Sequence, residues 1–377
     1  MTVFLGHLFL HSDRRRRRRS CVVGSMRLYI VRQRLFLARQ KISTSLLGSH
    51  YCYLPLERAT MRFAFPKNPS LPKPFPRQDQ LQIYSAADMQ CAGLETLGFD
   101  AAWRKRNFEE SKENRLRNAF GCTSAVLALL WEEIQTVIKN PINPKKETLH
   151  QFFVAMHFLK HYDTEEDQYD KWKIASNTFR DQNWNMIQKV SELFHLKCGW
   201  PEDNFDDDIL VGSIDGTHIM TEEVTHESIP KDPAMFSWKH HSAGWNLEIA
   251  LALRSSQIIH MSDPKPAGKW NDIKIFKQCG LLSQLKKKKK KMIADSGYQG
   301  CPKYLCLQNS YDSKEVAEFK RRARCRHEFI NKKFKNFKIL NSATGFRSSH
   351  KKLKMVIRAV AVIVQTNMDC GEPLWDV

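Results

Sequence analysis

The stretch at residues 211–220, VGSIDGTHIM, places a carboxylate inside a run of apolar residues. The residues that lead to it, from Ile209 to Ile214, form the short apolar run that is typical of a strand buried on both faces. A charge in such a strand costs free energy unless it is paired or binds a cation. An Asp-Gly dipeptide is also a common turn between two strands. Asp215 is therefore either a turn residue or a functional carboxylate with partners elsewhere in the chain.

The composition indicates a polyanionic partner. Lys and Arg number 60 against 40 Asp and Glu, a formal net charge of +20 at pH 7 over 377 residues. An excess of this size favours nucleic acid or a membrane surface. No apolar stretch is long enough to span a bilayer, so nucleic acid is the favoured partner and we expect no membrane association.

The 10 cysteines are scattered without a tight repeated spacing, which is typical of free thiols in a reducing compartment. A zinc site built from Cys301, Cys306, Cys325 and His327 is a weak alternative, because the spacing is irregular.

Residues 1–65 differ from the rest of the chain. They form a basic leader with six consecutive arginines at positions 14–19. We expect this leader to be disordered, or to be absent from a natural protein that starts at Met26 or Met61. The arginine run favours nuclear import, and an Arg-rich, acid-poor leader leaves a mitochondrial location as the alternative. A Pro-rich linker follows at residues 66–80.

Residues 81–200 have the pattern of helices. LHQFFVAMHFLKHY at 149–162 and SNTFRDQNWNMIQKVSELF at 176–194 repeat apolar residues at helical spacing, with Ser176 or Asn177 as the N-cap of the second helix. A basic residue such as Arg180 near the start of that helix suits a helix-turn-helix that binds DNA. An ordinary helical bundle explains the same periodicity, and both interpretations remain open.

Residues 201–377 alternate between strand and helix patterns. WNLEIALALR and QIIHM predict consecutive strands, the first with one buried face, and MIADSGY predicts a short strand that ends on Asp295. NDIKIFKQCGLLSQL predicts one helix capped by Asn271. A long basic helix that contains Glu328 and a second helix over KKLKMVIRAVAVIVQ follow. Two strands that carry Asp and a helix that carries Glu can bring three carboxylates together.

The carboxylates of Asp215, Asp295 and Glu328 would repel one another at such a site. They stay ionised together only with hard cations between them, and Mg²⁺ or Mn²⁺ matches oxygen ligands. Two such ions about 4 Å apart can activate a nucleophile and stabilise the leaving oxygen of a phosphodiester. His218 is more simply a structural hydrogen-bonding residue than a base, because a metal-activated water needs no histidine.

Taken together, these segments resemble the DDE transposases of the PIF/Harbinger type, which share the endonuclease domain of the Harbinger-derived nucleases. The resemblance covers residues 149–377 and rests on SIDGTH, FSWKHHSAGWNLEIAL, PAGKWNDIKIF, IADSGY, RARCRHEFINKKFKNFKIL and the closing GEPLWDV. It implies an α/β fold with a ribonuclease-H-like (retroviral-integrase-like) mixed sheet and flanking helices, preceded by a helix-turn-helix-like region. It also implies cleavage of transposon terminal repeats, strand transfer to target DNA and a Myb-like partner protein. A homo-oligomer is a further expectation.

By position, the resemblance makes Asp215, Asp295 and Glu328 the catalytic and metal-binding residues. Asp272 in WNDIKIF matches a recurrent family position and is a candidate fourth acid, although capping of the predicted helix explains it equally well. Asn331 and Lys335 lie three and seven residues after Glu328, on the same helical face. The basic residues expected to contact DNA phosphates are Arg180, Arg321, Arg322, Arg324, Arg326, Lys332 and Lys335.

The domain organisation expected from these patterns is a helix-turn-helix-like region at 81–200 followed by a catalytic domain at 201–377. One departure is the six-lysine tract at 286–291, where the family has a short loop. It suggests a decaying copy, so the alternative function is a decayed or domesticated DNA-binding protein that keeps the fold. A third interpretation is an RNA-processing nuclease of the same fold.

Overall fold

The computed structural model describes residues 83–136, 138, 148–200, 209–223, 232–343 and 345–377, all within one compact unit that spans residues 71–377. The predicted leader at 1–65 and the linker at 66–80 lie outside the described residues, so both stay predictions. No described helix is long and apolar enough to cross a membrane.

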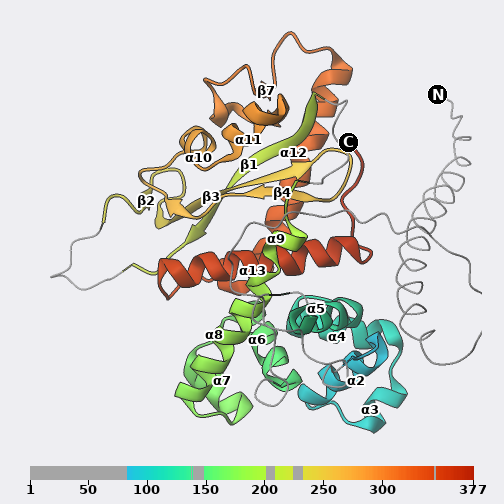
Figure 1. Ribbon diagram of the computed structural model, residues 1–377. Helices are drawn as coiled ribbons and strands as arrows, with labels where there is room; N and C mark the ends of the chain where they lie inside the picture. Colours follow the sequence, from blue (N-terminus) through green and yellow to red (C-terminus); the bar gives the residue numbers. More distant parts are fainter. Residues whose placement is uncertain (1–82, 137, 139–147, 201–208, 224–231, 344) are drawn as a thin grey trace, which may run out of the picture. The chain divides into compact units, whose positions relative to one another are not determined.

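The part that precedes the sheet is helical, as the sequence predicts (Figure 1). Capping boxes start three of its helices: the side chains of Thr148 and Gln151 accept hydrogen bonds from each other's backbone N–H groups, and Ser85 with Asp88 and Thr164 with Asp167 repeat the pattern. The helices are α2 (Ala86–Thr96), α3 (Ala101–Arg106), α4 (Glu109–Phe120), α5 (Ser124–Thr136), α6 (Leu149–His161), α7 (Glu165–Trp172), α8 (Ser176–Glu192) and α9 (Phe194–Lys197).

The connection between α7 and α8 is three residues long. Lys173 follows α7 with φ of 55°, in the left-handed region, and this turns the chain into α8. The predicted cap at Ser176 or Asn177 is wrong: the N-cap position is Ala175, which has no side-chain hydrogen bond. Arg180 forms an exposed ion pair with Glu165 across the turn.

The sheet is mixed, and one of its two longest strands carries Asp215 at its centre. β1 runs unbroken through Asp215 and Gly216, so the turn interpretation is wrong. It pairs antiparallel with β3 and parallel with β6, giving the order β4-β3-β1-β6-β7, with β2 and β5 also paired to β3. The strands are β1 (Leu210–Met220), β2 (Phe236–Ser237), β3 (Ser242–Ala252), β4 (Ile258–Met261), β5 (Lys265–Pro266), β6 (Lys291–Ala294) and β7 (Leu305–Leu307).

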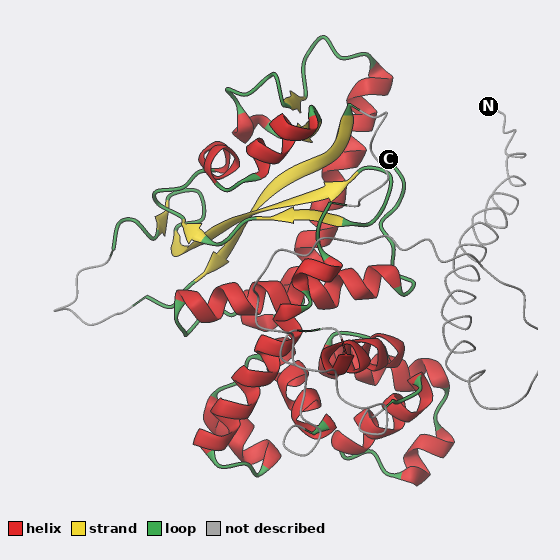
Figure 2. Cartoon of the chain, viewed as in Figure 1, coloured by secondary structure: helices red, strands yellow, loops and turns green. Residues whose placement is uncertain are grey.

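Helices cover both faces of this sheet (Figure 2). On one face, Ile214 and Ala250 pack in a cluster with Phe276 and Leu285 of the two helices α10 (Asp272–Gln278) and α11 (Leu281–Lys288). The sequence predicts a single helix here, but Gly280 adopts a φ of 99° and separates the two. The predicted strands at QIIHM and MIADSGY and the cap at Asn271 are confirmed.

The six-lysine tract does not form a loop. Its first three lysines are the last turn of α11, Lys289 ends that helix with φ of 55°, and Lys291 begins β6. Since lysines near a helix C-terminus interact favourably with the helix dipole, the tract is compatible with an ordered fold.

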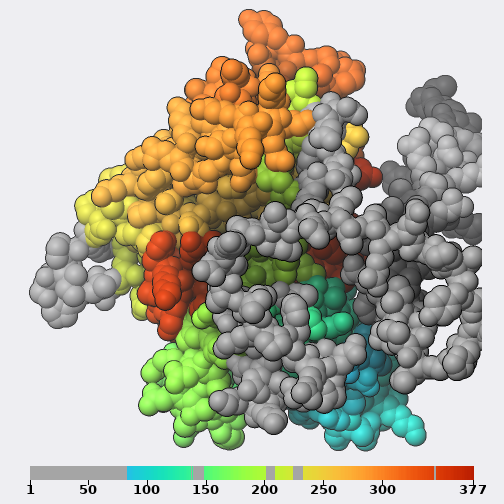
Figure 3. All heavy atoms as spheres, viewed as in Figure 1, coloured from blue at the N-terminus to red at the C-terminus, as the bar shows by residue number. Residues whose placement is uncertain are grey.

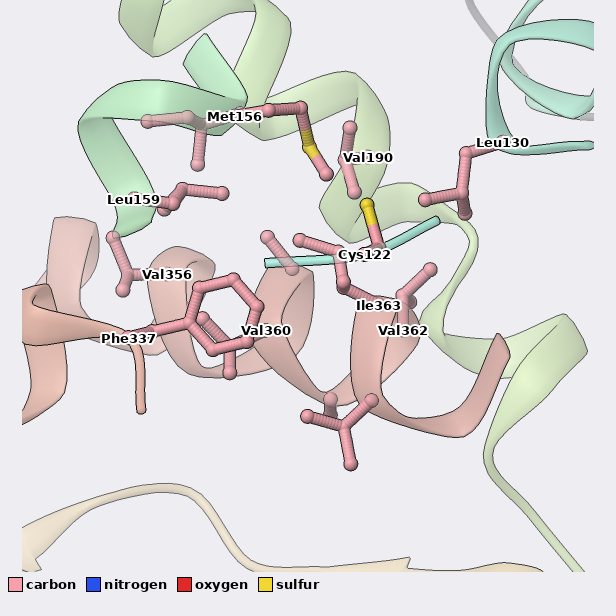
Figure 4. Packing of buried hydrophobic residues seen from close by; sticks show 14 of the residues in the cluster. Cys122, Leu130, Met156, Leu159, Val190, Phe337, Val356, Val360, Val362 and Ile363 are labelled. Carbon is pink, nitrogen blue, oxygen red and sulfur yellow. The ribbon is translucent and has the colours of Figure 1, made fainter. Parts of the chain in front are cut away.

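The opposite face of the sheet packs against two long helices, α12 (Lys314–Lys335) and α13 (His350–Asp369). α13 is buried on several sides and shares one apolar core with β1, β3 and the preceding helices. Figure 4 shows the packing of α13 against the preceding helices in this core. In the space-filling view α13, in red, lies between the yellow and orange sheet region and the green helices (Figure 3). Gln365 of α13 also accepts a hydrogen bond from the backbone of Ile258. Short 3₁₀ turns at Ser296–Tyr298 (η2) and Lys338–Leu340 (η3) complete the described elements.

This shared core makes the helical region and the sheet interdependent. We expect Ile363→Ala, at a position with 0% exposure, to lower the free energy of unfolding by about 2–5 kcal/mol. Both regions should unfold in one transition, followed in urea by far-UV circular dichroism and tryptophan fluorescence. The exposed Lys351→Ala on the same helix is the control and should leave stability nearly unchanged. Two separated transitions would instead support an independent domain boundary near Trp200.

Candidate active site

Asp215 and Asp295 come together because of the pairing of β1 with β6. The parallel register sets Ser213 opposite Ile293, and β6 ends one residue later at Ala294. Continuing that register by two residues places Asp215 beside Asp295, at the spacing of neighbouring strands, about 4.8 Å. Each carboxylate accepts a local backbone hydrogen bond of 2.9 Å, Asp215 from Gly216 and Asp295 from Gly297. The sequence prediction that these two acids converge agrees with this placement.

Asp272 lies at the same place. Asn271, not Asp272, caps α10, because its side chain accepts a hydrogen bond from Lys274 N. The Asp272 carboxylate instead lies against Gly216, where a Cβ atom would collide with Oδ1. A Cβ at Gly297 would lie 3.1 Å from both Asp272 Oδ2 and Asp295 Oδ1, so those two oxygens flank one glycine. Helix capping therefore does not account for Asp272.

The three aspartates repel one another electrostatically. Burial, followed by the charges of Asp295 and then Asp272, raises the pKa of Asp215 to about 6. Burial also raises the pKa of Asp272, and the Asp295 charge adds to that rise. The positive charge of Lys239 opposes both shifts. Among the residues that the structure describes, none of the three aspartates forms a salt bridge.

The donor set suits a hard divalent cation. All three groups offer carboxylate oxygens, which Mg²⁺ and Mn²⁺ prefer. In the described part of the chain, however, no three His, Cys, Asp or Glu side chains are drawn close enough to form a finished ligand set. The three carboxylates are thus neighbours that do not form a closed ligand set. A cation that binds between them would lower the pKa of Asp215 and draw the oxygens inward.

Glu328 is placed near this cluster by α12, but it does not join it. The preceding residue, His327, is buried and hydrogen-bonds through Nε2 to Ser213 Oγ at 2.9 Å, on the face of β1 that Asp215 shares. Glu328 itself is exposed. Within the described residues, no hydrogen bond or ion pair links Glu328 to an aspartate. The structure therefore brings together Asp215, Asp272 and Asp295, with Glu328 on the adjacent helix.

The histidines have structural roles. His218 contacts Asn246 through Nδ1 at 3.0 Å and Ser242 through Nε2 at 3.2 Å, in agreement with the structural role predicted for it. Because His327 is bound to Ser213, it is not available for the zinc site considered from the sequence. All described cysteines are free, and no metal cluster forms among the described residues.

The four arginines of α12 that were predicted to contact DNA differ in burial. Arg326 is 1% exposed, and its guanidinium donates to the carbonyls of Leu253 and Ser255, so the expectation that it contacts DNA is wrong. The other three arginines also have partners within the protein: Arg321 pairs with Glu318, Arg322 donates to the Asp376 carbonyl and Arg324 donates to Gln308.

Lys332 and Lys335 are exposed, and neither has a hydrogen bond or ion pair within the described residues. The positive charge of Lys335 also helps to lower the pKa values of His218 and His240, which places it beside the end of β1. Lys335 is therefore the predicted phosphate-contacting residue whose position fits that role best.

Sequence reasoning missed a buried acid beside the site. Glu248 of β3 pairs across the strands with Gly216 and has 0% exposure. Its carboxyl oxygens and the hydroxyl of Tyr298 are buried as neighbours, and Tyr298 is the hydrogen-bonding side chain beside Glu248. Burial, followed by the charge of Asp272, raises the pKa of Glu248 well above its ordinary value. The alternation in WNLEIALALR indicated one buried face, but both faces of β3 are buried, so Glu248 could not be recognised from the pattern.

The raised pKa predicts how stability depends on pH. Because burial raises the pKa of Glu248 well above 4.5, the unfolded chain loses this proton at a lower pH than the folded protein does. Its contribution to stability is therefore complete below about pH 4.5 and is lost as pH rises toward the folded pKa. Glu248→Gln has no proton to lose at this position, so its stability should not fall with rising pH for this reason. We expect the variant to gain stability relative to wild type between pH 5 and pH 8, measured by urea unfolding in EDTA. Glu110→Gln, at an exposed position, is the control, and a pH-independent difference would contradict the assignment.

Comparison with known proteins gives one match. Residues 214–365 match the family described as DDE superfamily endonuclease; this segment covers less than half of the chain and includes Asp215, Glu248, Asp272, Asp295 and Glu328. Neither curated proteins nor solved structures give a match. The match supports a nuclease of the DDE transposase type, whose members act on DNA and generally use divalent metals.

Proposed function

We propose that this chain is a metal-dependent DNA endonuclease and strand transferase of the Harbinger type. The observation that carries the proposal is the meeting of Asp215, Asp295 and Asp272 at the end of β6, inside the segment similar to DDE endonucleases. Transposon terminal repeats and a target site are its proposed substrates. A Myb-like partner, a homo-oligomer and a nuclear location belong to the same proposal.

The topology supports a ribonuclease-H-like fold. Three antiparallel strands, β4, β3 and β1, are followed by the parallel strands β6 and β7. In this arrangement Asp215, midway along β1, lies beside the carboxyl end of the parallel strand β6, which Asp295 follows. The carboxyl ends of parallel strands are where α/β sheets place ligands. The short α7–α8 connection supports a helix-turn-helix, with the exposed start of α8 as its DNA-binding face.

The mechanism assigns a task to each residue of the site. Asp215 and Asp295 would hold the cations, and either Asp272 or Glu328 would complete the set. Bound divalent cations supply Lewis acidity and an activated water for attack on a phosphodiester. Lys239 and Lys335 place positive charge where the DNA phosphates must lie. Gly216 and Gly297 keep the space in which the carboxylates approach.

The proposal is tested by cleavage of DNA that carries the terminal repeats flanking the gene, in the presence of Mg²⁺. Asp215→Asn and Asp295→Asn should each abolish cleavage and leave DNA binding near wild type, because each removes a cation ligand and no basic contact. Glu110→Gln is the control and should cleave normally. Comparison of Asp272→Asn with Glu328→Gln then identifies the third ligand.

Two outcomes would redirect the assignment. Wild-type protein that binds the repeats without cutting them would favour the decayed or domesticated DNA-binding protein, a function to which the position of Glu328 outside the aspartate cluster also points. Full activity in Asp215→Asn or Asp295→Asn would remove that residue from the catalytic set.

A further inference from the structure

One large aromatic side chain near the proposed site is open to solvent. Trp238 follows β2 and is 80% exposed. Its ring meets Phe236 edge to face, with a centroid distance of 5.1 Å and an interplanar angle of 84°, and this contact leaves most of the indole open to solvent. Exposing an indole of this size gives up the free energy of burying it, and such residues commonly mark binding surfaces.

Trp238 lies in the turn at residues 238–241 that joins β2 to β3, and this hairpin is held firmly at its base. β2 pairs with β3 through Phe236–Ala243 and Ser237–Ser242, and His240 N donates to Ser237 Oγ at 3.3 Å. Gly268 packs against the start of the hairpin: its N–H donates to the Ala234 carbonyl at 2.8 Å. The exposure of Trp238 is thus a feature of an anchored turn.

The hairpin is also tied to the strand that carries Asp215. His240 stacks on His218, with ring centroids 4.4 Å apart and an interplanar angle of 15°. His218 lies three residues beyond Asp215, about 10 Å along β1. Trp238 and Lys239 therefore lie within roughly one or two nucleotides' reach of the three carboxylates.

The charges around the hairpin fit a nucleic-acid strand. Lys239 is exposed, forms no hydrogen bond or ion pair within the described residues, and acts electrostatically on Asp215 and Asp272. Lys335 approaches the same histidine pair from α12. A lysine adjacent to the open indole and a second lysine beside the histidine pair provide contacts for phosphates, and the indole provides a flat surface for one base.

We propose that Trp238 stacks on an unpaired base of the DNA strand whose backbone lies at the carboxylate site, with Lys239 holding an adjacent phosphate. A paired base inside a duplex is already stacked on both sides and offers no face to the indole. The substrate would therefore be DNA that is opened or distorted next to the cut. This inference rests on the proposed function.

The test compares two 30-base-pair DNA duplexes of the same sequence, one fully paired and one with a single extrahelical 2-aminopurine. Binding is measured with the full chain in Ca²⁺ at one fixed salt concentration. Wild type should prefer the bulged duplex and quench the 2-aminopurine fluorescence. Trp238→Ala should weaken binding to the bulged duplex by about tenfold or more and leave binding to the paired duplex unchanged. Trp238→Phe should keep most of the preference.

Tyr311→Ala is the matched control, since Tyr311 is 92% exposed in the connection before α12, away from the hairpin. It should bind both duplexes as wild type does. Equal effects of Trp238→Ala on both duplexes, or none on either, would overturn the stacking role while the cleavage tests still stand. Failure of wild type to bind either duplex would overturn both the stacking role and the proposed function.

Discussion

The constraint on which the site depends is the repulsion between carboxylates that the strand pairing forces together. The β1–β6 register brings Asp215 level with Asp295, and α10 adds Asp272 against Gly216. The described part of the chain provides no salt bridge to offset these charges, and Lys239 offsets them only from a distance. A fold that needed only stability would place apolar or paired side chains here. The free-energy cost of placing three carboxylates together is understandable if a bound cation neutralises their charges during function.

The rest of the molecule holds this arrangement in place. His327 and Arg326 fix α12 against β1 and the β3–β4 turn through buried hydrogen bonds, and this brings Glu328 and Lys335 to the side of the site. α13 packs on the same face of the sheet as α12 and joins the sheet to the preceding helices in one core. The upstream helices are therefore part of the framework that supports the site. DNA held by α8 would have a fixed path to the carboxylates.

Local sequence patterns predicted much of this architecture. Apolar periodicity identified β1, β3, β4, β6 and the helices α6, α8, α12 and α13, because burial on a helix or strand imposes a regular spacing. The break at Gly280 was missed, since apolar spacing continues across it and only the backbone angle shows the turn. The cap of α8 was misplaced because the chain enters that helix without a side-chain cap.

The site was predictable to a lesser degree. Asp215 and Asp295 could be found because each interrupts or follows an apolar run. Asp272 could not be separated from a helix cap until Asn271 was seen to cap α10, and Glu248 was hidden because the second buried face of β3 depends on α10 and α11. Arg326 was grouped with the surface arginines, since a charge in a basic run gives no sign that its partners are backbone carbonyls 71 and 73 residues away.

The most direct measurement is a crystal structure of the full chain grown with Mn²⁺, with anomalous scattering collected at the manganese edge. We expect anomalous density between Asp215 and Asp295, with Asp272 or Glu328 as a further ligand and metal–oxygen distances of about 2.0–2.2 Å. Density at this position would show that the crowded carboxylates form a cation site. Aspartates that stay apart without density at saturating Mn²⁺, or manganese bound only elsewhere, would contradict the central claim.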